Sequence, residues 1–206
     1  MRVARLISPN GDGESVYAEL DTGEKLRIDT YLVAQFGLYA GMELDEETWE
    51  ALRAAAMQRQ TRKQALRMTG ARAMSRREIT DRLIRRGGSQ EDADDAAQWL
   101  EKLGVVDDAA YAGMIVRHYA SRGYGPARAK QELFRRGIPK ELWDDALGEL
   151  PDEEEAIGRL LAARIKGTPD RDQARKLADF LQRRGFGHEK IRAALERYLE
   201  DMGEEP

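Results

Sequence analysis

The chain has 206 residues, of which 35% are charged and 41% are hydrophobic, and its formal net charge at pH 7 is -4. It contains no cysteine. This excludes disulfides, a thiolate metal site and a thiol nucleophile. No apolar run approaches the roughly 20 residues of a membrane helix, and the first residues do not resemble a signal peptide. We therefore expect a helix-prone, soluble protein of the cytoplasm.

Residues 2–29 predict three short β-strands. In the first strand, Val3, Arg5 and Ile7 alternate with Ala4 and Leu6, and turn signals follow at Asn10-Gly11-Asp12-Gly13 and Asp21-Thr22-Gly23. Thr30 is expected to cap a short helix that ends at Gly37. We assign residues 1–44 to this antiparallel β meander and its short helix. Because so small a meander is marginally stable alone, it should pack on the helical segment that begins near residue 45.

From Asp45 the pattern is helical almost to the end of the chain. Ser75-Arg76-Arg77-Glu78 forms a capping box, Asp107 or Asp108 caps a later helix, and Pro126 suits the first turn of another. Nine helices are expected, beginning near residues 46, 75, 90, 107, 125, 139, 151, 168 and 187.

One short motif occurs three times. Leu83-Ile84-Arg85-Arg86-Gly87 returns as Leu133-Phe134-Arg135-Arg136-Gly137 and as Leu181-Gln182-Arg183-Arg184-Gly185. The flanking residues keep the same register, and a period in this range is typical of helical arrays. The fold expected is therefore mostly α, with three tandem three-helix units in a curved, elongated array. The units span residues 45–104, 105–150 and 151–206, the last including an acidic tail.

Charge alternates with the repeats. Residues 58–88 carry ten basic and two acidic side chains, whereas residues 141–157 carry eight acidic and no basic ones. Arginines in the last turn of a helix complement its dipole, which explains the paired arginines in part. It does not explain the further cations on the same helices, nor Arg59, Arg62, Lys63, Arg67 and Arg72.

Equivalent positions of a helical array line one surface, so matched arginines would form a basic stripe suited to phosphates or an acidic protein groove. We take as candidates for this partner- or DNA-binding basic stripe Arg76, Arg77, Arg82, Arg85, Arg86, Arg128, Lys130, Arg135, Arg136, Arg183 and Arg184.

Catalytic motifs are absent from the sequence. It contains no phosphate-binding Gly-x-x-x-x-Gly-Lys loop and no Gly-x-Ser-x-Gly elbow. Its two histidines, His118 and His188, are far apart, and the pair Asp107-Asp108 is better interpreted as a helix cap. We therefore predict no catalytic residue, no metal site and no cofactor.

The chain resembles the RecX family of recombinase regulators. The resemblance rests on Ser75-Arg76-Arg77-Glu78 with Leu83 and Gly87, on Gly104-Val105-Val106-Asp107-Asp108-Ala109-Ala110-Tyr111-Ala112, on Arg122-Gly123-Tyr124-Gly125-Pro126 and on Gln131-Glu132-Leu133-Phe134-Arg135-Arg136-Gly137-Ile138. These stretches cover the first two units well, and the third unit matches more loosely.

The resemblance implies a cytoplasmic, non-enzymatic protein that binds RecA and the groove of the RecA–single-stranded DNA filament. Such proteins suppress ATPase, strand exchange and coprotease activity by blocking filament growth or promoting disassembly. This implies a role in homologous recombination, DNA repair and the SOS response. We expect a monomer with weak direct DNA binding and no membrane contact.

Two alternatives remain open at this point. A stand-alone helical DNA- or RNA-binding module predicts tight, salt-sensitive DNA binding without RecA. A nuclease using the pairs Asp94-Asp95 and Asp144-Asp145 with Mg²⁺ predicts metal-dependent turnover. Because these pairs recur at the same repeat position, a scaffold role is the better interpretation.

Overall fold

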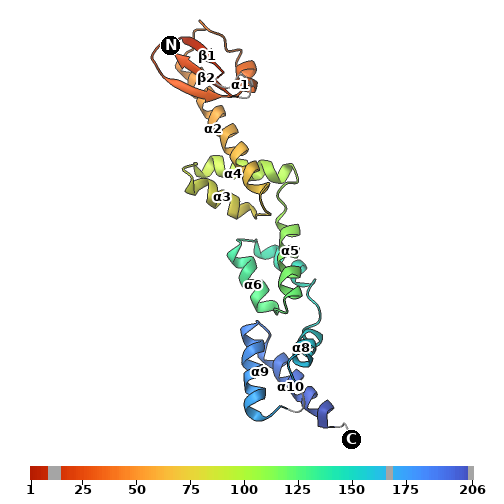
Figure 1. Ribbon diagram of the computed structural model, residues 1–206. Helices are drawn as coiled ribbons and strands as arrows, with labels where there is room; N and C mark the ends of the chain where they lie inside the picture. Colours follow the sequence, from red (N-terminus) through yellow and green to blue (C-terminus); the bar gives the residue numbers. More distant parts are fainter. Residues whose placement is uncertain (9–14, 166–168, 204–206) are drawn as a thin grey trace. The chain divides into compact units, whose positions relative to one another are not determined.

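The computed structural model describes residues 1–8, 15–165 and 169–203. The chain divides into two compact units. The first consists of Met1–Arg72 and Ile79–Val105, and the second of Ala73–Glu78 and Val106–Pro206. The α-helices and the short sheet predicted from the sequence are present (Figure 1).

The first unit begins with the expected antiparallel meander. Strands β1 (Val3–Ile7), β2 (Val16–Leu20) and β3 (Lys25–Ile28) pair in the order β1-β2-β3. The predicted turn at residues 10–13 lies outside the described residues. The inner face of the sheet packs on the next two helices, α1 (Thr30–Gln35) and α2 (Glu46–Thr69), around the fully buried Leu20, Leu32 and Leu52.

One cap in this region was predicted wrongly. Asp29, rather than Thr30, caps α1, because its carboxylate Oδ1 accepts the Leu32 amide proton at 3.0 Å while Thr30 is already helical. Farther along, α2 lies against α4 (Gln90–Lys102), the helix that follows α3 (Arg76–Arg85). A bidentate ion pair joins α2 to α4, with Arg62 Nε 2.8 Å from Asp95 Oδ2.

The second unit contains two apolar clusters. The first gathers α5 (Asp108–Ser121), α6 (Pro126–Arg135) and α7 (Trp143–Leu147), and the second gathers α8 (Glu153–Ala162), α9 (Arg171–Arg183) and α10 (His188–Gly203). Counting from α2, the described residues hold nine α-helices, the expected number. Among the apolar residues of these helices, Ile79, Leu83, Ala129, Leu133 and Leu181 are buried, whereas Trp143 and Leu177 are half-buried.

Three helices in the second unit have boundaries that differ from the prediction. The segment after Pro139 begins with a 3-10 turn, η1 (Lys140–Leu142), before α7 forms. The helix predicted to begin near residue 151 starts at Glu153. Asp170 caps α9 in a capping box with Gln173, so the helix begins later than predicted; Thr168 lies outside the described residues.

Each Leu-x-Arg-Arg-Gly motif ends a helix in the same way. The glycine has a positive φ of 92° at Gly87, 68° at Gly137 and 89° at Gly185. The amide of the residue after the glycine donates to the carbonyl of the motif's leucine, as from Ile138 to Leu133 at 3.0 Å. This is the Schellman arrangement, which uses a left-handed residue to satisfy the last helical carbonyls. The motif is therefore a helix-ending signal at all three places.

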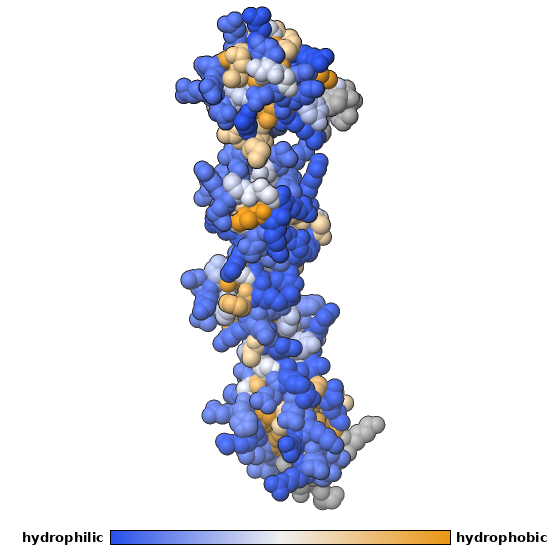
Figure 2. Space-filling model, turned by 90° about the vertical axis from the view of Figure 1, so that its left-hand side faces the viewer, coloured by the Kyte–Doolittle hydropathy of each residue, from blue (hydrophilic) through white to orange (hydrophobic). Residues whose placement is uncertain are grey.

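The face drawn in Figure 2 is mostly hydrophilic, with small, separate apolar patches. No helix in the described ranges has the length and apolar character needed to cross a membrane.

Candidate functional site

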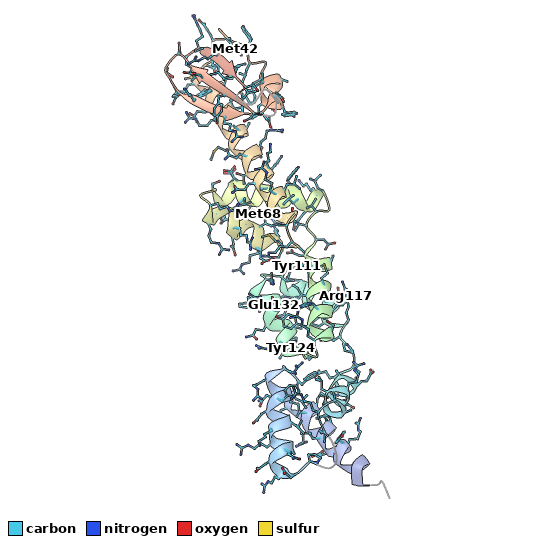
Figure 3. All side chains as sticks on the ribbon, viewed as in Figure 1. Met42, Met68, Tyr111, Arg117, Tyr124 and Glu132 are labelled. Atoms are coloured by element: carbon cyan, nitrogen blue, oxygen red, sulfur yellow. The ribbon has the colours of Figure 1, made fainter. Side chains whose placement is uncertain are left out.

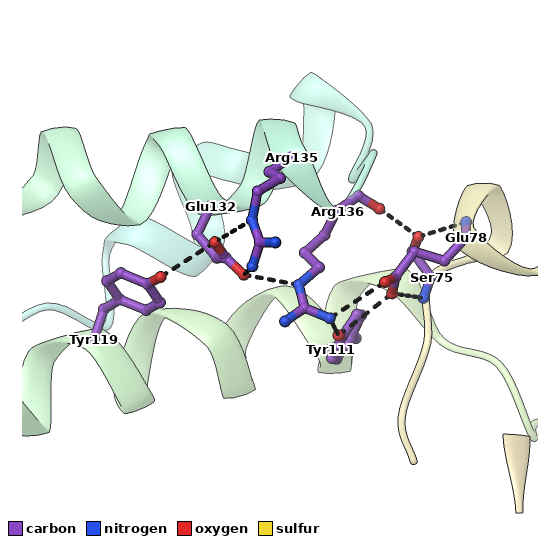
Figure 4. Close-up of polar contacts among 7 residues, drawn as sticks. All are labelled: Ser75, Glu78, Tyr111, Tyr119, Glu132, Arg135 and Arg136. Carbon is purple, nitrogen blue, oxygen red and sulfur yellow. Dashed lines mark hydrogen bonds and ion pairs between the residues drawn. The ribbon is translucent and has the colours of Figure 1, made fainter. Parts of the chain in front are cut away.

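The second arginine of the middle motif, Arg136, is bound within the second unit. Its Nη1 donates to Glu78 Oε1 at 3.2 Å and to the Tyr111 hydroxyl at 3.0 Å, and its Nε donates to Glu132 Oε1 at 2.7 Å (Figure 4). Its carbonyl accepts the Ser75 hydroxyl. Its side chain is only 26% exposed. Through these contacts, Arg136 connects the end of α6 to the start of α3 and to α5.

Arg184 in the third motif has the corresponding contacts. Its Nη1 donates to the carbonyls of Arg122 at 2.6 Å and Gly123 at 3.0 Å, and its guanidinium lies 5.1 Å from the centre of the Tyr124 ring. Its carbonyl accepts the Gly125 amide proton at 2.9 Å. Gly125 is the N-cap of α6, as Ser75 is of α3. Arg136 and Arg184 therefore both bind the beginning of the middle helix of the preceding three-helix repeat.

The glycine after each of these arginines also fits a close contact. A Cβ at Gly137 would overlap the side chain of Arg77, and a Cβ at Gly185 would lie 2.6 Å from the backbone nitrogen of Arg128. A Cβ at Gly87 would meet nothing within 4 Å. Arg136-Gly137 and Arg184-Gly185 therefore form the contacts between successive repeats, and each such pair is called a joint below.

The carboxylate of Glu132 organises the polar contacts of α6. It accepts bonds from Arg135 at 2.6 and 2.8 Å, from Arg136 at 2.7 Å and from the Tyr119 hydroxyl at 3.1 Å (Figure 4). Hydrogen bonds from Arg135, with further ones from Arg136 and Tyr119, lower the pKa of Glu132 to about 2 although burial opposes this shift. Burial, reinforced by Glu132, raises the pKa of Tyr119.

The first arginine of each motif is exposed instead. The Arg135 side chain is 66% exposed despite its bonds to Glu132, and Arg85 and Arg183 are also exposed. Arg85 makes a local bond from Nε to the Asp81 carbonyl at 3.1 Å. The remaining candidates of the basic stripe are Arg76, Arg77, Arg86, Arg128 and Lys130, which are exposed, and Arg82, which is half-buried.

A pocket of about 450 Å³ lies beside α5 and α6 in the second unit. Two candidates of the basic stripe, Arg128 and Arg135, line it together with residues that the sequence analysis did not select: His118, Tyr119, Arg122, Tyr124, Gln131 and Glu132. Figure 3 labels Tyr124, in the loop between these helices, and Glu132 on α6. The Tyr119 and Tyr124 rings lie 5.3 Å apart. In such an arrangement the exposed cations can bind a phosphate, and the aromatic rings can stack on a flat group such as a base.

Phe134 is a second residue that the sequence analysis did not select as a site residue. It lies between the leucine and the arginines of the middle motif, and it is 67% exposed. Its counterpart Ile84 is also exposed. A large exposed aromatic beside arginines is typical of an anchor in a protein interface.

Three carboxylates of the acidic pairs, Asp95, Asp107 and Asp108, have structural roles. Asp107 caps α5 by accepting the Ala110 amide proton at 2.9 Å, and Asp108 accepts the Arg76 amide proton at 2.9 Å. Asp95 pairs with Arg62. Within the described ranges, no group of three or more metal-ligating side chains could hold a metal ion.

Two family models match the second unit. The model of the second three-helix domain of RecX covers residues 107–147, and the model of the third covers residues 152–195. Two solved structures share the fold. The first, titled as the crystal structure of regulatory protein RecX, has a TM-score of 0.73 and 23% identity, and the match covers 97% of this chain and 98% of that one. RecX from Lactobacillus salivarius has a TM-score of 0.63 and 24% identity over 71% of this chain and 98% of that one.

Similar sequences have the same name, and they match this chain over most of their length. Regulatory protein RecX of Halorhodospira halophila is 34% identical over 151 residues, which is 72% of this chain and 94% of the relative. Regulatory protein RecX of Xanthomonas axonopodis pv. citri is 36% identical over 162 residues, which is 77% of this chain and 100% of the relative. At this identity and coverage, the chain belongs to the RecX family of regulatory proteins.

Proposed function

We propose that this protein regulates RecA by binding the RecA–single-stranded DNA filament. In this proposal it inhibits ATPase, strand exchange and coprotease activity, either by blocking filament growth or by promoting disassembly. The observation that carries the proposal is membership of the RecX family, whose similar members are named regulatory proteins. The protein would act as a non-enzymatic, cytoplasmic monomer in homologous recombination, DNA repair and the SOS response.

The proposed contact residues are the exposed candidates of the basic stripe, on each compact unit taken by itself, together with Phe134 on the second unit. The first arginines, Arg85, Arg135 and Arg183, are the strongest candidates because their side chains are exposed at the end of each middle helix. Arg136 and Arg184 are weaker candidates because their guanidinium groups already bind this chain. Phe134 would add apolar contact with protein, which phosphates alone do not require.

The first experiment is the ATPase rate of the cognate RecA on single-stranded DNA, with this protein added below one copy per RecA protomer. Strong inhibition at such ratios is the expected result, because a regulator that caps or disrupts a filament affects many protomers. Unchanged ATPase at a full equivalent would contradict the proposal.

A matched pair of variants tests the contact residues. The variant Arg85→Ala/Arg135→Ala/Arg183→Ala should lose inhibition while keeping its helical circular dichroism. The control removes three other exposed arginines, Arg159→Ala/Arg171→Ala/Arg192→Ala, and should inhibit like the unmodified protein. Equal inhibition by both variants would remove the first arginines from the contact.

The pocket of the second unit favours one alternative function, a stand-alone nucleic-acid-binding module. Its tyrosines, histidine and arginines are the combination that single-stranded nucleic acid uses for stacking and charge. This alternative predicts tight, salt-sensitive DNA binding together with unchanged RecA ATPase. The same ATPase titration therefore separates it from the proposed function.

A further inference from the structure

A strongly basic pocket lies in the first unit, where β3, α1 and α2 meet. Its volume is about 350 Å³, within the range of small-molecule sites. Among the described residues, five basic side chains line it, Arg27, Arg59, Lys63, Arg67 and Arg86, against one acidic side chain, Asp29. The lining therefore has an excess of positive charge.

The basic side chains on α2 are arranged along one face of the helix. Arg59, Lys63 and Arg67 follow each other at intervals of four residues. At 1.5 Å per residue, this series extends over roughly 12 Å. Cations spread over such a length suit several phosphates better than one.

Asp29 compensates only part of this charge. Asp29 Oδ2 accepts from Arg59 Nε at 2.7 Å, and its Oδ1 already caps α1. Arg27 Nε donates to the neutral Ser15 hydroxyl at 2.7 Å. Within the described residues, neither Arg67 nor Arg86 has a side-chain hydrogen bond or ion pair.

Arg86 differs from its repeat counterparts in a way that supports a ligand. Arg136 and Arg184 bind the start of the preceding middle helix, whereas the first motif follows no earlier repeat. Arg86 is exposed and lines the basic pocket. Its guanidinium thus remains available for an anion.

The base of the pocket is formed by the core of the unit. Ile28, Leu32 and Ala56 are among its lining residues and are 4%, 1% and 6% exposed. Such a base is rigid, and its low polarity strengthens the field of the cations around it. The lining that the structure describes contains no aromatic side chain, so it provides charge without a stacking surface.

We propose that this pocket binds a ligand carrying two or more phosphates. Two sources share this chemistry, a nucleoside triphosphate and successive phosphates of a nucleic-acid strand. Arginines bind phosphate oxygens through charge-assisted, often paired hydrogen bonds. Gln60 and Gln64, on the same face of α2, add amide donors.

Calorimetric titration of the full chain at low ionic strength tests the proposal, with ATP and a short oligothymidylate as probes. The variant Arg67→Gln/Arg86→Gln should bind the true ligand at least about tenfold more weakly. For the oligonucleotide, the slope of log affinity against log salt should also fall by about 1.4, because two phosphate contacts are lost on a single strand. The control Lys102→Gln/Lys140→Gln removes the same charge from exposed positions outside the pocket and should bind as the unmodified protein does.

The two probes separate the two sources. ATP binding that depends on Arg67 and Arg86 supports a free nucleotide, and oligonucleotide binding with the same dependence supports a strand. The proposal would be overturned if neither probe binds, or if the variant and the control weaken binding equally. Because no RecA is present, either result is independent of the proposed function.

Discussion

The two arginines of a motif differ in role although they are adjacent in sequence. At the end of α6, Arg135 is mostly exposed whereas Arg136 is half-buried between helices. A sequence pattern identifies both as basic residues in a last helical turn. Only the positions of Glu78, Tyr111 and Glu132, from three parts of the chain, determine that Arg136 is held internally.

Glu132 is the residue whose removal should disturb this arrangement most. The substitution Glu132→Gln leaves Arg135 and Arg136 beside a neutral amide and should lower the free energy of unfolding by about 2 to 4 kcal/mol. Glu196→Gln is the control, because Glu196 forms an exposed pair with Arg192 and should cost less than about 0.5 kcal/mol. Urea denaturation followed by circular dichroism measures both. Equal effects would show that Glu132 contributes no more than a surface pair.

The pH dependence of stability is set in part by the same carboxylate. Because the pKa of Glu132 falls from 4.5 to about 2 on folding, its contribution is fully present above pH 4.5. That contribution, about 3 kcal/mol, is lost as pH falls towards 2. The stability difference between the unmodified protein and Glu132→Gln should therefore shrink over this window. Urea denaturation at several pH values measures it, and a constant difference would contradict the low pKa.

At the scale of the element, the glycines that end the middle helices should differ in their tolerance of substitution. Gly87→Ala meets only the cost of a left-handed backbone, about 1 to 2 kcal/mol. Gly137→Ala and Gly185→Ala add overlap with Arg77 and Arg128, so each should cost about 1 kcal/mol or more beyond Gly87→Ala. Thermal denaturation of the three variants compares them. Equal costs would mean that the repeats separate locally at little expense.

Helix starts were predictable where the signal is local. Ser75 and Glu78 form the expected capping box, with the Glu78 amide proton donated to Ser75 Oγ at 3.1 Å. The 3-10 turn before α7 was not predictable, because an apolar pattern does not distinguish i+3 from i+4 hydrogen bonding. The later start of α9 depends on the choice of Asp170 over an earlier residue as cap.

The candidate site was also predictable only where the sequence signal is local. Repetition of the motif identifies the arginines, but it makes every repeat look equivalent. Tyr119, Tyr124 and Glu132 line one pocket because α5 and α6 pack together. One sequence signal was the position of Glu132, three and four residues before the arginine pair, where a helix brings such side chains together.

At the scale of the whole molecule, the division into two compact units implies that a local change in one should leave the other protected. Arg184 tests this, because all its contacts lie within the second unit. In Arg184→Ala, amide hydrogen exchange should accelerate in residues 122–125 and at the end of α9, where carbonyls and rings lose their cation. Exchange in α2 and α4 should stay unchanged.

Arg183→Ala is the matched control for this experiment, since Arg183 is the exposed neighbour in the same motif. It should leave exchange unchanged in both units. Faster exchange in α2 and α4 of Arg184→Ala would show that the two units unfold together. Equal exchange in the two arginine variants would show that the Arg184 contacts add no stability. The expected result, acceleration confined to the second unit and to one arginine of the pair, would assign Arg184 to the joint between repeats and leave Arg183 available for a partner.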